Sequence, residues 1–237
     1  MKLLKEAISM VLAGLGYSIR RTSTYNTGIM SEFRTIPIRS ILDIGAADGD
    51  TAASFLNAYK DAHVYAFEPL PEPFRDLSQM TQRFSDRLSA YNIALGDSET
   101  ELEMKRHVDH SPSSSLLTTT ALSNEMYPEG TVQENIKVRT TTLDAWFASQ
   151  SPQPQLELLV KMDCQGYEDR IICGGKNTLR QAKVCIIEVL FKDLYEKQAS
   201  FKEIFTLMDE IGFRYHGNFE QGVNNRGLVY ADVLFVK

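Results

Sequence analysis

The chain has 237 residues, 43% of them hydrophobic, which is enough for the core of one domain of ordinary size. Its formal net charge is −6, whereas a nucleic-acid-binding surface needs excess positive charge, so we expect no nucleic acid partner. The three cysteines form no C-x-x-C pair and are too few to staple a fold of this size. This cysteine usage predicts a reducing, cytoplasmic location.

The first 34 residues predict an N-terminal helix followed by a polar lead-in. Apolar residues within the first 15 positions fall on one helical face, with Lys2, Lys5 and Glu6 opposite. Glu6, Gly14 and Gly16 interrupt the apolar run, which argues against a signal peptide, a membrane anchor or other membrane association.

Residues 35–237 have the pattern of a single α/β domain. Short apolar runs alternate with helical patterns, which is typical of a parallel sheet covered by helices on both faces. The expected parallel strands are 41–44, 64–67, 90–95, 158–163 and 184–189. The expected helices are 51–59, 71–84, 167–182 and 200–211.

Other parts of this domain depart from the parallel pattern. Apolar and polar residues alternate around 101–104 and 136–140, which predicts antiparallel edge strands. The segment 107–135 is rich in Ser, Thr and Pro and too long for an ordinary connection, so we expect a lid or substrate loop. Two short strands, 213–216 and 231–236, are expected to form a C-terminal hairpin.

The loop after the first strand carries the strongest functional signal. The sequence DIGAADGDT begins at Asp43 and lies between a buried strand and a helix, and its small residues let a cofactor approach the backbone. Three residues separate Gly45 from Gly49, whereas a dinucleotide loop has the spacing G-x-G-x-x-G. A nicotinamide-dependent oxidoreductase is therefore a weaker alternative that the spacing leaves open.

Glu68 ends the second predicted strand, between Phe67 and Pro69. At the carboxyl end of a parallel strand, an acidic side chain can accept hydrogen bonds from both ribose hydroxyls of a bound nucleoside. Its position at the ligand-binding edge of the sheet favours this role over that of a surface carboxylate.

Four sequence runs resemble the FkbM family of S-adenosylmethionine (SAM)-dependent methyltransferases: ILDIGAADGDT, VYAFEP, SSSL at 113–116 and LLVKMDCQGYE. The resemblance covers about residues 41–182. It implies a class I (Rossmann-like) fold, with a seven-stranded, mostly parallel sheet whose last strand is antiparallel. It also implies SAM as cofactor and O-methylation of a hydroxyl on a sugar, polyketide or other small metabolite.

The same resemblance implies which residues bind the cofactor. In the family, the first loop binds the methionine part of SAM, the acid after the second strand binds the ribose, and a later segment lies near the adenine. The matching residues here are Asp43, Gly45, Ala46, Gly49, Glu68, Pro69 and Ala94, with Asp163 near the methionine end.

One departure from the family pattern affects the expected activity. The family more usually has Val-Glu-Gly where this chain has Cys164-Gln165-Gly166, so an acid expected near the site is a neutral amide. This leaves a catalytically inactive SAM-binding partner subunit as an alternative to an enzyme.

Three residues are candidates for catalysis. Asp163 follows a buried strand, where it could orient the cofactor amine or the acceptor hydroxyl, or cap the next helix. Glu188 faces the same cleft if the register of its strand allows. His110 could accept the hydroxyl proton, or be a solvated loop histidine. We expect Lys161 to point to a wetter face.

We expect no metal in the site. A hard cation such as Mg²⁺ requires several oxygen ligands in near-octahedral geometry, and Asp163 and Glu188 are accompanied by no Asp-Asn pair. The expected partner is a small hydroxylated acceptor, and the sequence leaves a homo-oligomer open.

Overall fold

The computed structural model describes residues 36–108, 113–128, 132–225 and 227–237. The predicted N-terminal helix and His110 lie outside these residues. Ile36–Lys237 forms one compact unit. Within the described part of the chain, no helix has both the length and the apolar character needed to cross a membrane.

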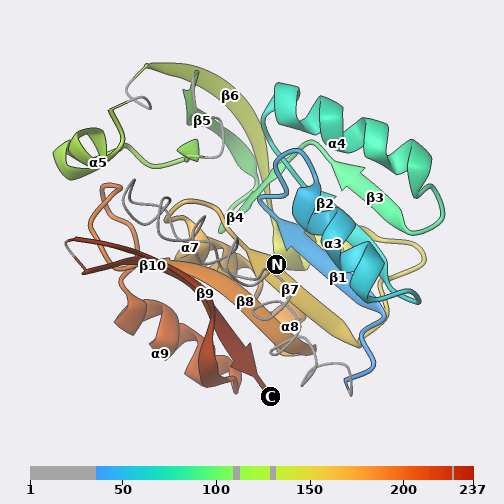
Figure 1. Ribbon diagram of the computed structural model, residues 1–237. Coiled ribbons are helices and arrows are strands. Elements are labelled where there is room, and N and C mark those ends of the chain that lie inside the picture. The colour runs from blue at the N-terminus through green and yellow to red at the C-terminus, as the bar shows by residue number, and fades with distance from the viewer. Residues whose placement is uncertain (1–35, 109–112, 129–131, 226) are drawn as a thin grey trace, which may run out of the picture. The chain divides into compact units, whose positions relative to one another are not determined.

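Seven strands form the main sheet (Figure 1). They are β1 (Ser40–Ile44), β2 (His63–Phe67), β3 (Leu88–Tyr91), β7 (Leu158–Met162), β8 (Ala182–Leu190), β9 (Arg214–Asn224) and β10 (Gly227–Val236). Their order is β3-β2-β1-β7-β8-β10-β9. The first five are parallel, and β10 pairs antiparallel with both β8 and β9. The predicted class I sheet, with its last strand inserted antiparallel, is therefore confirmed.

Helices cover both faces of this sheet, as predicted. They are α3 (Asp50–Ala58), α4 (Pro71–Arg83), α6 (Leu143–Ser149), α7 (Glu168–Gly174), α8 (Lys176–Leu179) and α9 (Phe201–Ile211). Side chains of α6 to α9 form one buried core with strand residues such as Leu42, Val160 and Ile187. On α3, Phe55 and Leu56 are buried, and this helix contacts β1 and β2. Burial of these apolar faces is the main stabilising term of the fold.

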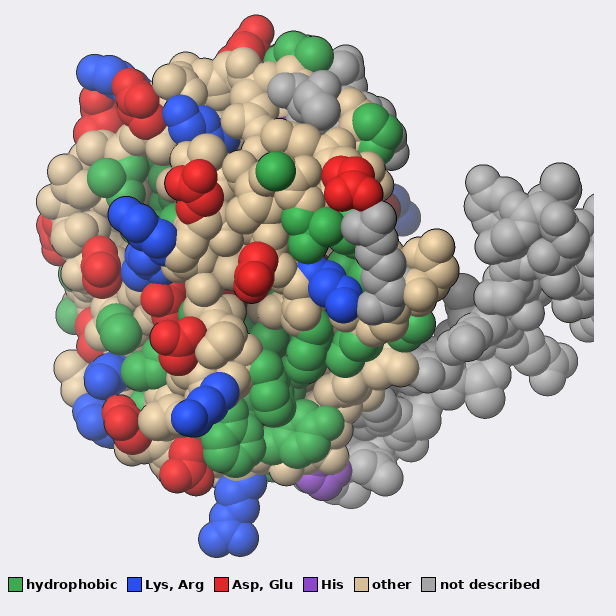
Figure 2. Space-filling model, turned by 90° about the vertical axis from the view of Figure 1, so that its left-hand side faces the viewer, with side chains coloured by type: hydrophobic (Ala, Val, Ile, Leu, Met, Phe, Trp, Pro, Cys, Tyr) green, Lys and Arg blue, Asp and Glu red, His purple; other side chains and the backbone are tan. Residues whose placement is uncertain are grey.

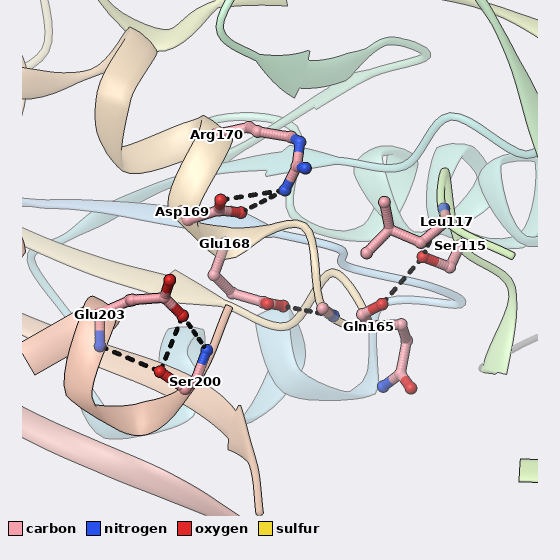
Figure 3. Close-up of polar contacts among 9 residues, drawn as sticks. Ser115, Leu117, Gln165, Glu168, Asp169, Arg170, Ser200 and Glu203 are labelled. Carbon is pink, nitrogen blue, oxygen red and sulfur yellow. Dashed lines mark hydrogen bonds and ion pairs between the residues drawn. The ribbon is translucent and has the colours of Figure 1, made fainter. Parts of the chain in front are cut away.

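The start and end of α9 show how local sequence sets helix boundaries. The Ser200 hydroxyl accepts a hydrogen bond from the Glu203 backbone N–H (3.3 Å), and the Glu203 carboxylate accepts one from the Ser200 N–H (2.8 Å) (Figure 3). This capping box satisfies N–H groups that the helix leaves unpaired. Gly212 ends the helix in a left-handed conformation (φ 95°), which favours glycine.

The prediction of a single third strand over 90–95 is wrong. The chain forms β3 in the main sheet and then β4 (Ala94–Gly96) in a second sheet. Between them the Asn92 amide donates to the backbone carbonyls of Glu68 and Pro69, both at 2.9 Å. These bonds turn the chain away from the main sheet.

The antiparallel pair predicted in the middle of the chain is present, but not as an edge of the main sheet. The strands β5 (Thr100–His107) and β6 (Gln133–Thr142) pair with each other and, with β4, form a separate three-stranded sheet in the order β4-β6-β5. The alternation of apolar and polar residues indicated that these strands have one exposed face. It could not indicate which sheet they join.

Three other predicted segments differ in detail. The helix predicted over 167–182 is interrupted at Gly175, whose backbone is not helical (φ −123°, ψ 13°), so α7 and α8 are separate. The segment 107–135 contains a short helix, α5 (Ala121–Met126). The C-terminal hairpin is confirmed, with strands longer than predicted.

The packing of α7 against β4 gives a stability test. A Cβ on Gly174 would lie 2.0 Å from the carbonyl oxygen of Gly96, whereas one on Gly212 would meet nothing within 4 Å. We expect Gly174→Ala to lower the free energy of unfolding by about 3 kcal/mol because backbone must move. We expect Gly212→Ala to cost only about 1 kcal/mol, from its left-handed backbone. Urea unfolding measures both, and equal losses would contradict this packing.

Candidate functional site

The loop after β1 is fixed by backbone contacts with β2 and β7. The N–H groups of Gly45 and Ala46 donate to the Phe67 carbonyl at 3.0 and 2.9 Å. Gly45 has φ 80°, and a Cβ there would lie 1.9 Å from the carbonyl oxygen of Asp163. Only glycine therefore allows the end of β1 to lie this close to the end of β7.

Glu68 joins this loop to the start of α4. Its carboxylate accepts the Ala47 N–H at 3.0 Å and the Leu70 N–H at 2.7 Å, one on each oxygen. Each oxygen keeps a further lone pair for another donor. The side chain is buried, and burial raises its pKa to about 7 although the two backbone bonds oppose the shift.

A cavity lies at the carboxyl edge of the sheet, beside the β1 loop and Glu68. The predicted cofactor residues in its wall are Gly45, Glu68, Pro69, Ala94 and Asp163. Ala46 and Gly49 are buried and do not line it. Gly49 instead starts α3 with φ 97°, and a Cβ there would lie 2.8 Å from Met80. Its position favours a role in shaping the loop.

Asp43 lies behind the cavity wall, fully buried. Neither of its carboxylate oxygens has a hydrogen-bond partner among the described residues. Burial raises the pKa of Asp43 to about 6, against the effect of Lys161, which lowers it. A buried carboxylate without a hydrogen-bond donor is costly, and the nearby charge of Lys161 partly offsets that cost.

Lys161 lies in the site, and the prediction that it points to a wetter face is wrong. Its side chain is buried, and Nζ lies 2.9 Å from Asp163 Oδ2. Asp163 directly follows β7 and lies two positions beyond Lys161, so the two side chains lie on the same side of the sheet. Burial lowers the pKa of Lys161, but the charges of Asp163 and Asp43 outweigh burial and raise it.

The strand register brings more acids to the same face. Asp43 pairs with Lys161, and Lys161 with Ile186. Glu188 is two residues beyond Ile186 and pairs with Asp232 of β10. Side chains at paired positions share a face. Lys161 thus lies near the carboxylates of Asp43 in β1, Asp163 just after β7 and Asp232 in β10.

Gln165 connects the two candidate catalytic acids. Its Nε2 lies 2.9 Å from Asp163 Oδ1 and 2.9 Å from Glu188 Oε2. The Tyr195 hydroxyl lies 2.9 Å from Gln165 Oε1. The backbone carbonyl of Gln165 accepts the Ser115 hydroxyl at 2.8 Å, as Figure 3 shows. The amide that departs from the family pattern is therefore the centre of a hydrogen-bonded network.

The environments of Asp163 and Glu188 push their pKa values apart. Burial would raise the pKa of Asp163, but the ion pair with Lys161 and its hydrogen bonds lower it. Burial, together with the negative charges of Asp163 and Glu168, raises the pKa of Glu188 well above its ordinary value. Two neighbouring carboxyl groups with separated pKa values can hold one proton between them.

Several residues in or beside the cavity were missed by sequence reasoning. They include the lining residues Leu70, Ser114, Leu116 and Tyr167, whereas Gln165, which also lines the cavity, was expected near the site. Ser114 and Leu116 belong to the SSSL run, which could have pointed to them. Tyr195 carried no signal, because it follows β8 in a connection without any motif.

No set of three or more His, Cys, Asp or Glu side chains in the described part of the chain is arranged to hold a metal ion. His107 is buried at the end of β5 and near Gln133, and it does not line the cavity.

The sheet order, the glycine loop and the acid after β2 define a class I methyltransferase. The family model of the methyltransferase FkbM domain matches residues 43–215. The chain therefore belongs to the FkbM methyltransferase family, which confirms the resemblance seen in the sequence. SAM is the cofactor that membership of this family implies.

One relative and two solved structures illustrate this likeness. The 2-O-methyltransferase NoeI of Sinorhizobium fredii (strain NBRC 101917 / NGR234) is 28% identical over 200 residues, which are 77% of this chain and 75% of NoeI. Methyltransferase FkbM from Methylobacillus flagellatus KT has a TM-score of 0.51 and 12% identity, over 85% of this chain but 44% of that protein. Magnesium protoporphyrin IX methyltransferase from Synechocystis PCC 6803, solved with SAM, has a TM-score of 0.50 and 10% identity, over 91% of this chain and 78% of that protein. Both structures share the fold.

The burial of Glu68 predicts a pH effect on stability. Its pKa rises from 4.5 to about 7 on folding, so the folded state holds this proton more tightly than the unfolded state. This contribution to the free energy of unfolding is complete below 4.5, the unfolded pKa, and is lost as pH rises through about 7, the folded pKa. Relative to Glu68→Gln, we expect the unliganded wild type to lose about 1 to 3 kcal/mol between about pH 5.5 and 8.5.

Urea unfolding across this pH range measures the difference between the two proteins. Glu99→Gln is the control, because Glu99 is exposed. A wild type that gains stability relative to Glu68→Gln as pH rises would show that the carboxyl group is not buried in this way.

Proposed function

We propose that this protein transfers a methyl group from SAM to a hydroxyl of a small metabolite. The observation that carries the proposal is the cavity between Gly45, Glu68 and Asp163, with the unpartnered carboxylate of Asp43 behind it. A nucleoside with a cationic amino acid tail fits this donor set, since Glu68 has acceptor capacity for ribose hydroxyls and the acids can receive an ammonium group.

The chain's own residues bind and orient the reactants. A bound SAM supplies a methyl group on a good leaving group, so alignment and exclusion of water are the main tasks of the protein. Gly45 lets the backbone approach the methionine end, while Glu68 and Pro69 face the ribose. Ala94 lies at the adenine end of the cavity, among apolar lining residues. Ala46 and Gly49 support the loop from behind.

Asp163 and Glu188 are the proposed catalytic acids. Lys161 keeps Asp163 ionised at the cavity wall, where it can orient the acceptor hydroxyl and accept its proton. Gln165 holds Glu188 beside Asp163, and burial raises the pKa of Glu188 so that it favours its protonated form, which leaves Asp163 as the ionised carboxylate that can accept the proton. His110 stays a candidate base outside the described residues.

The segment 107–135 is proposed to cover the acceptor. Its described part is tied to the connection after β8, since the Thr120 N–H donates to the Leu194 carbonyl at 2.9 Å and the Glu196 N–H to the Thr118 carbonyl at 2.8 Å. Ser114 and Leu116 line the cavity from this segment. It is therefore well placed to contact both the cofactor and the acceptor.

Calorimetry with S-adenosylhomocysteine (SAH) tests the cofactor site. We expect SAM and SAH to bind at one site and NAD not to bind, because the loop lacks dinucleotide spacing. Glu68→Gln should weaken SAH binding by about 1.5 to 3 kcal/mol, through lost charge-assisted hydrogen bonds. Glu72→Gln is the control, because Glu72 is exposed. Unchanged SAH affinity in Glu68→Gln would show that Glu68 does not bind the cofactor.

Turnover tests the roles of Asp163 and of metal. Asp163→Asn should reduce methyl transfer by about 10²-fold or more and SAH affinity much less, because the lost group acts on the proton. Transfer should survive EDTA. If EDTA abolishes it and magnesium restores it, Asp163 is a metal ligand. SAH binding without transfer to any acceptor would support the alternative of an inactive SAM-binding subunit.

A further inference from the structure

Tyr195 connects two parts of the cofactor cavity wall without lining the cavity itself. It follows β8 and is 3% exposed. Its hydroxyl lies 2.7 Å from the backbone carbonyl of Ser113 and 2.9 Å from Oε1 of Gln165. Both atoms are acceptors, so they share the single hydroxyl hydrogen. Burial and the charge of Glu188 raise the pKa of Tyr195, so the hydroxyl keeps this hydrogen.

Gln165 has a strained backbone that several contacts hold in place. Its φ of 54° lies in the left-handed region, which few residues other than glycine adopt. The Glu168 carboxylate accepts the N–H of Cys164, the preceding residue, at 2.7 Å. The backbone carbonyl of Gln165 accepts the Ser115 hydroxyl, as Figure 3 shows. Strain of this kind persists only where neighbouring contacts fix the conformation, which makes the position of Gln165 a candidate for a role in the site.

The partners of the Gln165 side chain determine which way its amide points. Both hydrogens of Nε2 have a carboxyl acceptor, one on Asp163 and one on Glu188, each at 2.9 Å. Oε1 faces the Tyr195 hydroxyl. In the opposite orientation, Oε1 would lie against the two carboxyl groups and the Tyr195 hydroxyl would lose an acceptor. The hydroxyl therefore favours the orientation in which the amide donates to both acids.

Residues 113–116 line the cavity at alternate positions. Ser114 and Leu116 are in its wall. The other two residues face the network instead, since the Ser113 carbonyl accepts from Tyr195 and the Ser115 hydroxyl donates to the backbone after β7. Because lining and bonded residues alternate, loosening these bonds would displace the wall.

The charged surface of the molecule does not depend on Tyr195. Acidic and basic side chains of the described residues are interspersed on the face that Figure 2 shows, which carries α5 and α9. Removing the buried hydroxyl of Tyr195 leaves these charges unchanged. An effect of that change on cofactor affinity would therefore pass through the interior.

We propose that Tyr195 is a positioning residue for the cofactor. Its hydroxyl orients the Gln165 amide and ties it to the backbone of Ser113. Gln165, Ser114 and Leu116 are thereby held together as one wall of the cavity. This inference rests on the proposed function, in which the cavity holds SAM, and adds a residue that does not touch the ligand. Without the hydroxyl, both acceptors lose their donor, and binding must order a looser wall.

Calorimetry with SAH tests this role. Tyr195→Phe removes the hydroxyl and keeps the ring, and we expect it to weaken SAH binding about three- to tenfold. Tyr91→Phe is the matched control, because the Tyr91 hydroxyl also donates to a glutamine oxygen, Gln150 Oε1 at 3.0 Å, and Tyr91 does not line the cavity. We expect this control to leave SAH affinity unchanged.

A double-mutant cycle with Gln165→Met tests whether Tyr195 acts through the amide. This change keeps the length of the side chain but removes its acceptor and its donors. If the two residues act together, Tyr195→Phe should weaken SAH binding much less in the Gln165→Met background than in wild type. The full loss in that background would refute the role of the amide.

NMR reports the orientation of the amide without the cofactor. The side-chain amide hydrogens of Gln165, assigned by their absence in Gln165→Met, should exchange slowly with water in wild type because both are bonded to carboxyl groups. We expect Tyr195→Phe to speed their exchange about tenfold or more, while backbone exchange in the main sheet stays unchanged. A merely structural role for Tyr195 would instead speed exchange throughout the sheet.

Two further results would overturn the proposal: unchanged SAH affinity in Tyr195→Phe, or equal exchange of the Gln165 amide in the two proteins. Failure of wild type to bind SAH would instead refute the proposed function itself. The amide exchange needs no cofactor, so it separates the two failures.

Discussion

The contact between Gly45 and the Asp163 carbonyl is the constraint on which the site depends. There is no room for a Cβ at this point, so the loop after β1 and the end of β7 meet backbone to backbone. That contact places Asp43 behind the loop and Asp163 at the cavity wall. Glu68 then fixes the other side of the loop through the Ala47 N–H. These backbone restraints fix one side of the cavity at the sheet edge, and side chains such as Phe67, Leu116 and Tyr167 complete its wall.

Charge in this site is governed by the strand register. Lys161 lies among Asp43, Asp163 and Asp232, and its ion pair with Asp163 is largely removed from water. A buried ion pair contributes little net stability, because desolvation offsets the attraction. In this site the ion pair instead makes two neighbouring carboxyl groups differ in pKa. Asp163 stays ionised, while Glu188 beside it favours its protonated form. The Gln165 amide donates to both carboxyl groups and adds no negative charge, whereas an ionised acid in its place would repel them.

The sequence was sufficient for four of the five parallel strands and for the positions of the β1 loop and the acid after β2, because each follows from local apolar runs and turn residues. It was insufficient where contacts between residues far apart in the sequence determine the structure. Asn92 ends β3 through bonds to carbonyls after β2, and nothing local reports those bonds. Lys161 appeared polar and therefore exposed, but its partners belong to other strands, and only the register brings them together. Ala46 and Gly49 match a binding motif but do not line the cavity, and a motif alone does not separate residues that touch a ligand from residues that shape the loop.

A crystal structure of the protein with SAH would show directly where the cofactor binds. We expect the ribose hydroxyls within hydrogen-bonding distance of the Glu68 carboxylate, with the amino acid tail beside Gly45 and its ammonium group near Asp43 or Asp163. SAH bound elsewhere, or bound in this cavity with its ribose away from Glu68, would contradict this expectation.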